Sequence, residues 1–470
     1  MIDDGCSGVL PLTGRLEPWQ RDLCDRPELL AAWIAEHGSP LNVLDPGPLG
    51  RHAAELQDVA TTHGIRLDVY FARKANKALT FVDEANRLGL GVDVASEREL
   101  RQVLERGVPA HKVMVTAAVK PRALLEICVA SGVTVVIDNA DELALLIRLA
   151  AISECGTSLA LRLAPQLPGR APSRFGLDRE QILALVEHHL TTRDERAPKL
   201  VGVHFHLDGY AVDDRVAALD QSVELVDALR SLGHAPKFID IGGGIPISYL
   251  DDADEWDRFW REHRAAVLGE REPLTFEGHG LGLVAHAGEI VGRPNVYPYH
   301  QQPIRGPWLE QVLGQSADAI AERGLELRCE PGRALLDGCG LTAARVEFRK
   351  QQRDGTWLIG VAMNRTQCRS TSDDYLVDPL LVRPGSPLGE SSARSIEGYL
   401  VGAYCIEREL LTWRRLRFPH GVDIGDIVVF PNTAGYFMHI LESASHQIPL
   451  ARNVVGSAAR RAELDPIDLL

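Results

Sequence analysis

Between residues 68 and 330 the chain alternates apolar, strand-like runs with amphipathic, helix-like segments, and this alternation strongly constrains the fold. Eight such runs, each followed or preceded by a helical pattern, are what a (β/α)8 TIM barrel requires. A doubly wound open sheet could also use eight strands, so the pattern alone leaves both α/β architectures open. The predicted strands span 68–73, 91–95, 112–117, 133–138, 158–163, 199–206, 237–241 and 325–330.

Two regions depart from this alternation. Residues 251–308 separate the last two predicted strands by far more chain than one helix needs. A loop of this length is usually functional, as a lid or an oligomer contact, although a surface elaboration would look the same. After Arg333, short runs such as 345–348, 356–359 and 426–430 predict a mostly antiparallel β domain.

Bulk properties limit the partners and the compartment. A formal net charge of -15 argues against nucleic acid or an anionic membrane as the main partner. No apolar run reaches the roughly 18 residues of a membrane span, and the first residues do not resemble an export signal. The eight cysteines are scattered without a CxxC pair, so no zinc site is indicated. We therefore expect reduced thiols in a cytoplasmic protein.

Polar residues stand where several of the predicted strands end, and the carboxyl ends of barrel strands carry the chemistry. Lys74 follows the first strand. Burial there can remove the proton from its amine and make it an imine-forming nucleophile, although a solvated charge at a strand end is the simpler interpretation. Asp93 lies on the second strand and His206 ends the sixth. His204 would point the same way as His206, so spacing does not choose between these two histidines.

The end of the seventh strand is suited to hold a phosphate. Gly242, Gly243 and Gly244 follow that strand, and their backbone N–H groups can surround an oxyanion. Tight turns also use glycine freely. Arg333, after the eighth strand, can add a bidentate charged contact. Barrels commonly hold phosphate after these two strands, which makes the signal more specific.

A lysine and a phosphate site together indicate pyridoxal phosphate, whose aldehyde forms an imine with a lysine. The cofactor needs an anion that keeps its ring nitrogen protonated. Glu330, three residues before Arg333, is well placed for this, although a buried ion pair is the alternative role. His206 could lie flat on the ring, whereas a lone histidine on a strand is usually structural.

These residues resemble the fold-type III pyridoxal-phosphate decarboxylases, the group of ornithine and diaminopimelate decarboxylases, and the resemblance runs from about Leu41 to Tyr436. It implies that Lys74 carries the imine, that His206 stacks on the ring and that Tyr436 reaches the phosphate. The motifs that carry the resemblance are Phe71-Ala72-Arg73-Lys74-Ala75-Asn76, Gly91-Val92-Asp93-Val94-Ala95-Ser96 with Glu99, His204-Phe205-His206, Gly242-Gly243-Gly244, Glu330-Pro331-Gly332-Arg333, Cys405 and Ala434-Gly435-Tyr436.

The resemblance also implies an architecture and an assembly. We expect an alanine racemase-like barrel over residues 46–334, with an insertion at 251–308, and a β domain built from residues 1–45 and 335–470. The family's functional unit is a head-to-tail homodimer with shared active sites. Cys405 would then cross the interface to the lysine of the other subunit; without the resemblance, a packing role would be the default for a cysteine.

Decarboxylation of an amino acid is the activity that the resemblance implies. The substrate amine would displace Lys74 and form an external aldimine, and the α-carboxylate would leave as carbon dioxide. Glu330 would keep the ring positive while it accepts the electrons, and Cys405 would return a proton to the α-carbon.

Some positions depart from the family pattern. Ile406 stands where the family usually has an acidic residue that grips a distal amine, and an isoleucine cannot balance a buried ammonium. Glu407 faces the other way if the backbone is extended. Two arginines lie in 364–371, a segment that leads to Asp373 and Asp374. We therefore expect a substrate side chain that is not a simple cation, but neutral or carboxylate-bearing.

A second departure concerns the cofactor and the branch of the family. Residues 207–210 lack the small hydroxyl residue that often touches the phosphate there, which puts that contact in doubt. The long 251–308 segment is similar to atypical branches of the superfamily that work in specialised biosynthesis, where substrates can be unusual or tethered.

Two other functions compete with decarboxylation. A racemase or epimerase on the same barrel would need a second acid/base, usually a tyrosine, facing the lysine, and the presence of Cys405 argues against it. A catalytically silent relative that binds partners would be favoured by loss of Lys74, Glu330 or Cys405, and all three are present.

Overall fold

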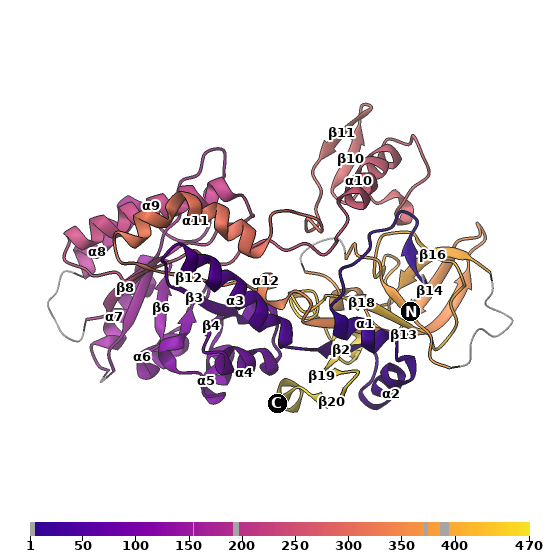
Figure 1. Ribbon diagram of the computed structural model, residues 1–470, viewed down its shortest axis with the longest axis horizontal. Coiled ribbons are helices and arrows are strands. Elements are labelled where there is room, and N and C mark those ends of the chain that lie inside the picture. Colours follow the sequence, from indigo (N-terminus) through magenta and orange to yellow (C-terminus); the bar gives the residue numbers. More distant parts are fainter. Residues whose placement is uncertain (1–4, 154, 191–196, 371–374, 386–393) are drawn as a thin grey trace.

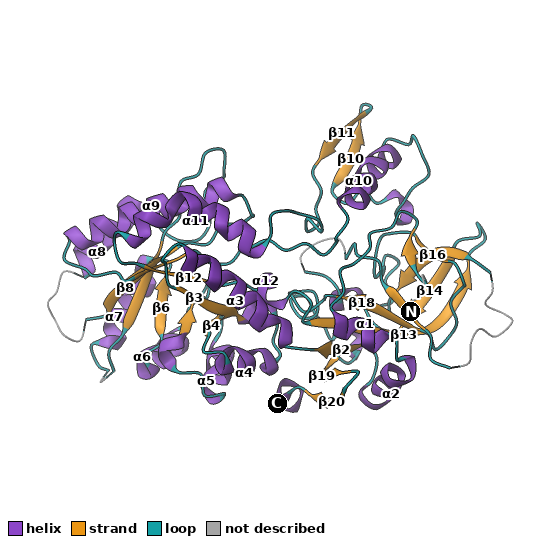
Figure 2. Ribbon diagram, viewed as in Figure 1, coloured by secondary structure: helices purple, strands orange, loops and turns teal. Residues whose placement is uncertain are grey.

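The computed structural model describes residues 5–153, 155–190, 197–370, 375–385 and 394–470. Asp373 and Asp374, named above as possible neighbours of the substrate, lie outside the described residues. The chain forms two lobes, with a ring of helices around strands in one and a large sheet in the other (Figures 1 and 2).

The first lobe is a closed barrel of eight strands in the order β12-β3-β4-β5-β6-β7-β8-β9. The barrel closes because β12 pairs in parallel with both β3 and β9. This confirms the predicted (β/α)8 barrel and excludes the open sheet. The strands are β3 (Leu67–Ala72), β4 (Gly91–Val94), β5 (Val113–Val115), β6 (Thr134–Ile137), β7 (Ser158–Arg162), β8 (Lys199–His204), β9 (Phe238–Asp240) and β12 (Glu326–Cys329).

Helices surround this barrel, and local sequence signals start several of them. Ser96 and Asn139 accept hydrogen bonds from the backbone N–H groups three residues later, which satisfies donors that a helix start leaves free. Asp178 starts α8 with a capping box. The helices are α3 (Gly47–Thr62), α4 (Leu79–Arg87), α5 (Glu97–Glu105), α6 (Arg122–Ser131), α7 (Ala140–Ala150), α8 (Arg179–His189), α9 (Val212–Ser231) and α11 (Arg305–Ala321).

Large side chains fill the inside of the barrel, so it is a packed core and not a pore. Tyr70 and Phe238 belong to a small buried cluster distinct from the main core that includes Val69 and Phe71. Gly91 leaves room for Tyr70, because a Cβ there would lie 2.3 Å from the Tyr70 ring. These side chains fill the barrel interior below its carboxyl rim, so a site can form only at that rim.

The second lobe is a mostly antiparallel sheet that both chain ends build, as the resemblance implied. From the N-terminal side, β1 (Ser7–Gly8) pairs with β17 (Leu416–Phe418). In the same lobe, β2 (Leu41–Leu44) pairs with β13 (Gly340–Gln351) and β19 (Arg452–Ser457). The domain boundaries proposed above stay a prediction. The other strands are β14 (Trp357–Val361), β15 (Leu380–Val382), β16 (Ile396–Val401), β18 (Ile427–Pro431) and β20 (Arg460–Leu464), and α1 (Pro18–Cys24) and α2 (Pro27–His37) pack beside them.

The 251–308 insertion carries α10 (Ala253–Val267) and a hairpin of β10 (Leu283–His286) and β11 (Glu289–Gly292), which project away from the barrel (Figure 1). It packs on the β lobe, since the Phe276 N–H donates to the Trp413 carbonyl at 2.8 Å and Arg408 pairs with Glu277 at 3.0 Å. Among the described residues, no helix is long and apolar enough to span a bilayer.

Candidate active site

The turn that carries Lys74 is anchored from both lobes. Lys74 lies in η1 (Arg73–Ala75), directly after β3. Arg73 is buried and donates to Gln102 Oε1 at 2.5 Å, which holds the turn against α5. Asn76 donates to the Ala434 carbonyl of the β lobe at 2.9 Å. The lysine therefore sits on a rigid turn where the two lobes meet.

Two buried carboxylates face the Lys74 amine. Its Nζ lies 3.0 Å from Asp93 Oδ2 and 3.9 Å from Glu330 Oε2. Burial lowers the pKa of Lys74, but Asp93 and Glu330 raise it by more, so the net shift is upward. The expectation that desolvation removes this proton is therefore wrong for the chain by itself, because the carboxylates keep the ammonium charged.

Asp93 is the nearer of these carboxylates and is fully buried on β4. It accepts a hydrogen bond from Thr116 Oγ1 at 2.5 Å in addition to the one from Lys74. Burial raises the pKa of Asp93 to about 6, with help from Glu330 and against the influence of Lys74. Thr116 was not predicted from the sequence, because a single threonine near the end of the predicted strand 112–117 carries no distinctive signal.

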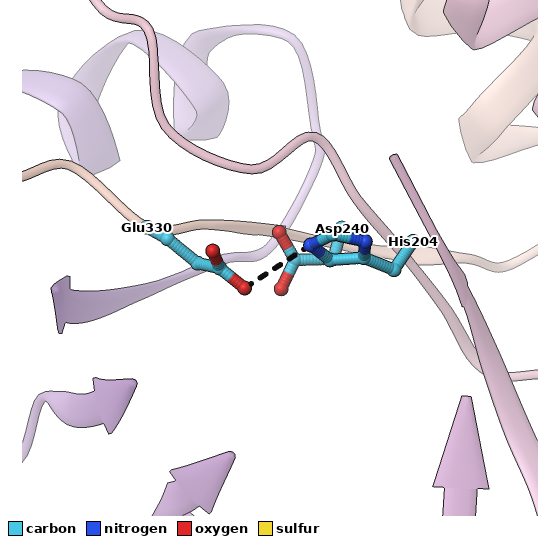
Figure 3. A group of neighbouring side chains, drawn as sticks. All are labelled: His204, Asp240 and Glu330. Atoms are coloured by element: carbon cyan, nitrogen blue, oxygen red, sulfur yellow. Dashed lines mark ion pairs between the residues drawn. The ribbon is translucent and has the colours of Figure 1, made fainter. Parts of the chain in front are cut away.

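Glu330 belongs to a buried group with His204 and Asp240 (Figure 3). His204 Nε2 lies 3.3 Å from Glu330 Oε1. Burial lowers the pKa of His204 well below its usual value, so this imidazole is neutral. Burial also raises the pKa of Asp240 and of Glu330. Within the described part of the chain, neither carboxylate oxygen of Glu330 has a hydrogen-bond partner.

Asp240 is a member of this group that sequence reasoning missed. It is the only charged residue in the apolar run 238–241, and a lone carboxylate in a buried strand is a signal that could have identified it. Its Oδ1 accepts the Gly242 N–H at 2.8 Å, so it also shapes the start of the glycine turn. One histidine and two carboxylates within 4.8 Å are a set that could also hold a divalent cation.

A cavity of about 490 Å³ opens beside this group, lined by glycines. A Cβ on Gly243 would lie 2.9 Å from the Glu330 carbonyl oxygen, and one on Gly332 would lie 2.8 Å from the Tyr436 hydroxyl. Gly244 has a φ of 74°, a conformation that favours glycine. The absence of side chains here creates a cradle in which backbone groups reach a ligand.

Arg333 closes one side of this cradle at the start of α12 (Arg333–Leu336). Its Nη1 donates to the Tyr249 hydroxyl at 2.9 Å and to the Gly435 carbonyl at 3.0 Å, and its Nη2 donates to Ser370 Oγ at 2.8 Å. Tyr436 also lines the cavity, and its N–H donates to the Ala75 carbonyl at 2.8 Å. The β lobe thus helps to fix the guanidinium.

His206 stands between this cavity and a second one of about 240 Å³, which Lys74 lines. The sequence pattern predicts that this strand ends at His206, but β8 ends at His204. His206 Nδ1 instead accepts the Gly243 N–H at 3.1 Å, so the ring is held by the glycine turn. Burial lowers the pKa of His206 well below its usual value.

Cys405 lies apart from these groups. It is exposed, as are its neighbours Ile406 and Glu407, and it lines neither of the two cavities. The structure therefore brings together Lys74 and the residues from the barrel strands, but leaves Cys405 on the surface of this chain.

The residues present fit pyridoxal phosphate. Glu330 offers buried carboxylate oxygens that can accept a hydrogen bond from a protonated ring nitrogen, and the glycine cradle with Arg333 suits a phosphate. Lys74 supplies the amine for an aldehyde. A closed barrel with these groups at its rim defines a pyridoxal-phosphate enzyme of the barrel class.

Comparisons with known proteins identify the family. A family model described as "Pyridoxal-dependent decarboxylase, pyridoxal binding domain" matches residues 50–289. The chain is 31% identical over 453 residues to the uncharacterized protein y4yA of Sinorhizobium fredii, covering 93% of this chain and 92% of that protein. It is 23% identical over 453 residues to a diaminopimelate decarboxylase of Zymomonas mobilis, covering 94% and 93%. The chain belongs to the pyridoxal-dependent decarboxylases of fold type III, which bind pyridoxal phosphate.

Solved structures of this fold agree. A diaminopimelate decarboxylase from M. jannaschii superimposes with a TM-score of 0.70 at 17% identity, covering 93% of this chain and 92% of that chain. A lysine/ornithine decarboxylase from Vibrio vulnificus gives 0.65 at 17% identity, covering 94% and 100%. These likenesses concern the fold and leave the substrate open.

Proposed function

We propose that this chain decarboxylates an amino acid, or an intermediate derived from one, with pyridoxal phosphate held at Lys74. The observation that carries the proposal is the meeting of Lys74 with Asp93 and Glu330 at 3.0 and 3.9 Å, beside a glycine-lined cavity closed by Arg333. When bound, the cofactor supplies an electron sink for the carbanion that loss of carbon dioxide leaves.

Each residue has a defined task in this proposal. Glu330 accepts a hydrogen bond from the ring N–H and keeps that nitrogen charged, since a nearby carboxylate favours the cationic form. Gly243, Gly244 and Arg333 bind the phosphate. His206, which Gly243 holds by its N–H, orients the ring by lying against its face.

A second copy of the chain completes the site in this proposal. Cys405 is the proposed acid that returns a proton to the α-carbon, yet it is exposed and lines neither cavity of its own chain. A homodimer in which Cys405 reaches the Lys74 of the other subunit explains this position. All eight cysteines are free thiols, which suits a reducing cytoplasm.

Two arginines in the cavity walls support a substrate side chain that is not a simple cation. Arg162 and Arg174 stack on the Phe175 ring at 4.4 and 3.8 Å, and these residues line the two cavities. A distal ammonium would approach these guanidiniums with unfavourable like charge. Ile406 offers no carboxylate to offset that repulsion. A neutral or carboxylate-bearing side chain avoids both costs.

A screen of carbon dioxide release tests the proposal. The purified protein, loaded with pyridoxal phosphate, is offered L- and D-amino acids, with dicarboxylic, neutral and cationic members, and products are checked for racemisation. We expect carbon dioxide from a neutral or dicarboxylic substrate and none from the Lys74→Ala variant. Racemisation without carbon dioxide would identify a racemase, and absence of the visible band of lysine-bound cofactor would identify a silent relative.

A further inference from the structure

The hairpin of the 251–308 insertion projects away from the barrel (Figure 1). Its return arm, residues 293–304 between β11 and α11, instead lies against the cofactor cradle, because Tyr297 contacts Tyr210 and Arg333. The Tyr249 N–H donates to the Tyr299 carbonyl at 2.8 Å. Gln301 Nε2 donates to the Ile247 carbonyl and to the Tyr297 hydroxyl, both at 2.9 Å. The bonds to Tyr249 and Ile247 attach the arm to main-chain groups of the segment that follows the glycine turn.

The arm places an aromatic ring on the arginine of the cradle. The guanidinium carbon of Arg333 lies 4.4 Å from the centre of the Tyr297 ring, closer than to Phe437 at 4.9 Å or Tyr436 at 5.0 Å. An arginine over an aromatic face is attracted by the ring's quadrupole, and the attraction grows when the pair is shielded from water.

The Tyr297 ring is itself held in place. It packs edge-on against Tyr249, with ring centres 5.4 Å apart at 89°, and against Tyr210 at 5.8 Å and 73°. Tyr249 accepts the Arg333 hydrogen bond, and Tyr210 lines the cradle. Arg333 is thus oriented by hydrogen bonds from the edge of its guanidinium plane and by rings on its faces.

This arrangement leaves part of the guanidinium for a ligand. An arginine has five N–H donors, and Arg333 uses three of them on Tyr249, Gly435 and Ser370. A side chain whose rotamers are already restricted loses less entropy when it binds an anion. Preorganisation therefore favours binding of an anion in the cradle.

We propose that Tyr297 is a positioning residue for Arg333, and that through it the 251–308 insertion retains the phosphate of the cofactor. This inference rests on the proposed cofactor site and adds a role for a segment that the barrel does not need. In this role the aromatic face of Tyr297, and not its hydroxyl, keeps the Arg333 guanidinium directed at the cradle.

Cofactor binding by the full-length chain tests this role without any assay of turnover. The protein is freed of cofactor and titrated with pyridoxal phosphate and, separately, with pyridoxal, which lacks the phosphate. The visible band of lysine-bound cofactor gives the dissociation constant, and thermal melting shows that each variant folds. Tyr297→Leu and Tyr297→Met remove the ring, Tyr297→Phe keeps it, and Phe276→Leu is the matched control. Phe276 belongs to the same insertion and is also half-buried, but it contacts Tyr399.

We expect Tyr297→Leu and Tyr297→Met to weaken pyridoxal phosphate binding about tenfold, while pyridoxal binding and the Tyr297→Phe and Phe276→Leu variants stay within about twofold of the wild type. Two ring-free variants are included so that a folding failure of one leaves the test intact. Ring-free variants that bind pyridoxal phosphate like the wild type, or that lose pyridoxal equally, would overturn the role of Tyr297. A wild-type chain that gives no band with pyridoxal phosphate would instead overturn the cofactor site itself, and this inference with it.

Discussion

Replacing Asp93 by asparagine tests whether the buried carboxylates control the charge of Lys74. The atoms Asp93 Oδ2 and Lys74 Nζ are 3.0 Å apart. Two unit charges at that separation attract by about 5 kcal/mol at an effective dielectric constant of about 20. The Lys74 side chain is 31% exposed, and the new amide oxygen can still accept a hydrogen bond. We therefore reduce the loss to about 3 kcal/mol, or roughly two pKa units.

Glu330 stays in place 3.9 Å from Lys74 and keeps the amine partly charged. Because a lysine attacks an aldehyde only as the neutral amine, Asp93→Asn should speed the formation of the visible band with pyridoxal phosphate at neutral pH. The expected increase is on the order of a hundredfold, as two pKa units imply.

The assay is stopped-flow absorbance on protein freed of cofactor, repeated across pH. The rate of the variant should level off at a lower pH than that of the wild type. Asp138→Asn is the matched control, because that carboxylate lies 3.5 Å from Arg162 and has no contact with Lys74. A rate for Asp93→Asn that equals or falls below the wild-type rate would refute the argument that Asp93 holds the proton on Lys74.

Three further predictions concern the shared active site, a buried histidine and the glycine turn. If the active site is shared between subunits, mixing inactive Lys74→Ala and Cys405→Ala proteins should restore roughly a quarter of wild-type activity, since mixed dimers carry one intact site; an inactive mixture would place the acid elsewhere. Burial lowers the pKa of His439 to about 3. Between pH values of about 6.5 and 3 the imidazole is therefore protonated in the unfolded chain but not in the folded chain. The free energy of unfolding should decrease as the pH decreases through this range, by up to about 1.4 kcal/mol per pH unit. His439→Gln should flatten that dependence in urea unfolding, and an unchanged slope would contradict it. Gly243→Ala would bring a Cβ to 2.9 Å from the Glu330 carbonyl oxygen. This change should lower the free energy of unfolding by about 1–3 kcal/mol and weaken cofactor binding. A variant that binds the cofactor normally would show that the turn can shift to accommodate the methyl group.

Much of the barrel could be predicted because its signals are local. The eight strands are recognised from apolar, strand-like runs that alternate with helical patterns, and their boundaries agree with the structure to within a few residues. The end of β8 was placed too late, because His206 bonds to the Gly243 N–H and leaves the strand, a contact between segments that no local pattern reports. Lys74, Glu330 and Arg333 were identified because all strand ends of a parallel barrel meet at one rim.

The charge state of Lys74 could not be predicted in this way. A lysine at the end of a buried strand loses its proton through burial or keeps it through neighbouring carboxylates, and the outcome depends on distances of 3.0 and 3.9 Å to groups on other strands. Thr116 and Tyr297 were missed for the same reason, since each acts through a neighbour that is distant along the chain. Asp240 is different, because a lone carboxylate in a buried strand is a local signal.

The amino-acid sequence by itself determined which segments become strands and helices and which chemical groups stand at the strand ends, because periodicity and turn chemistry act between neighbouring residues. Closure of the barrel and docking of the β lobe decided the rest. They set the separation of Lys74 from its two carboxylates and brought Tyr297 of the insertion onto Arg333. The strength of electrostatic and aromatic interactions depends on the separation of the groups, and only the folded chain sets these separations.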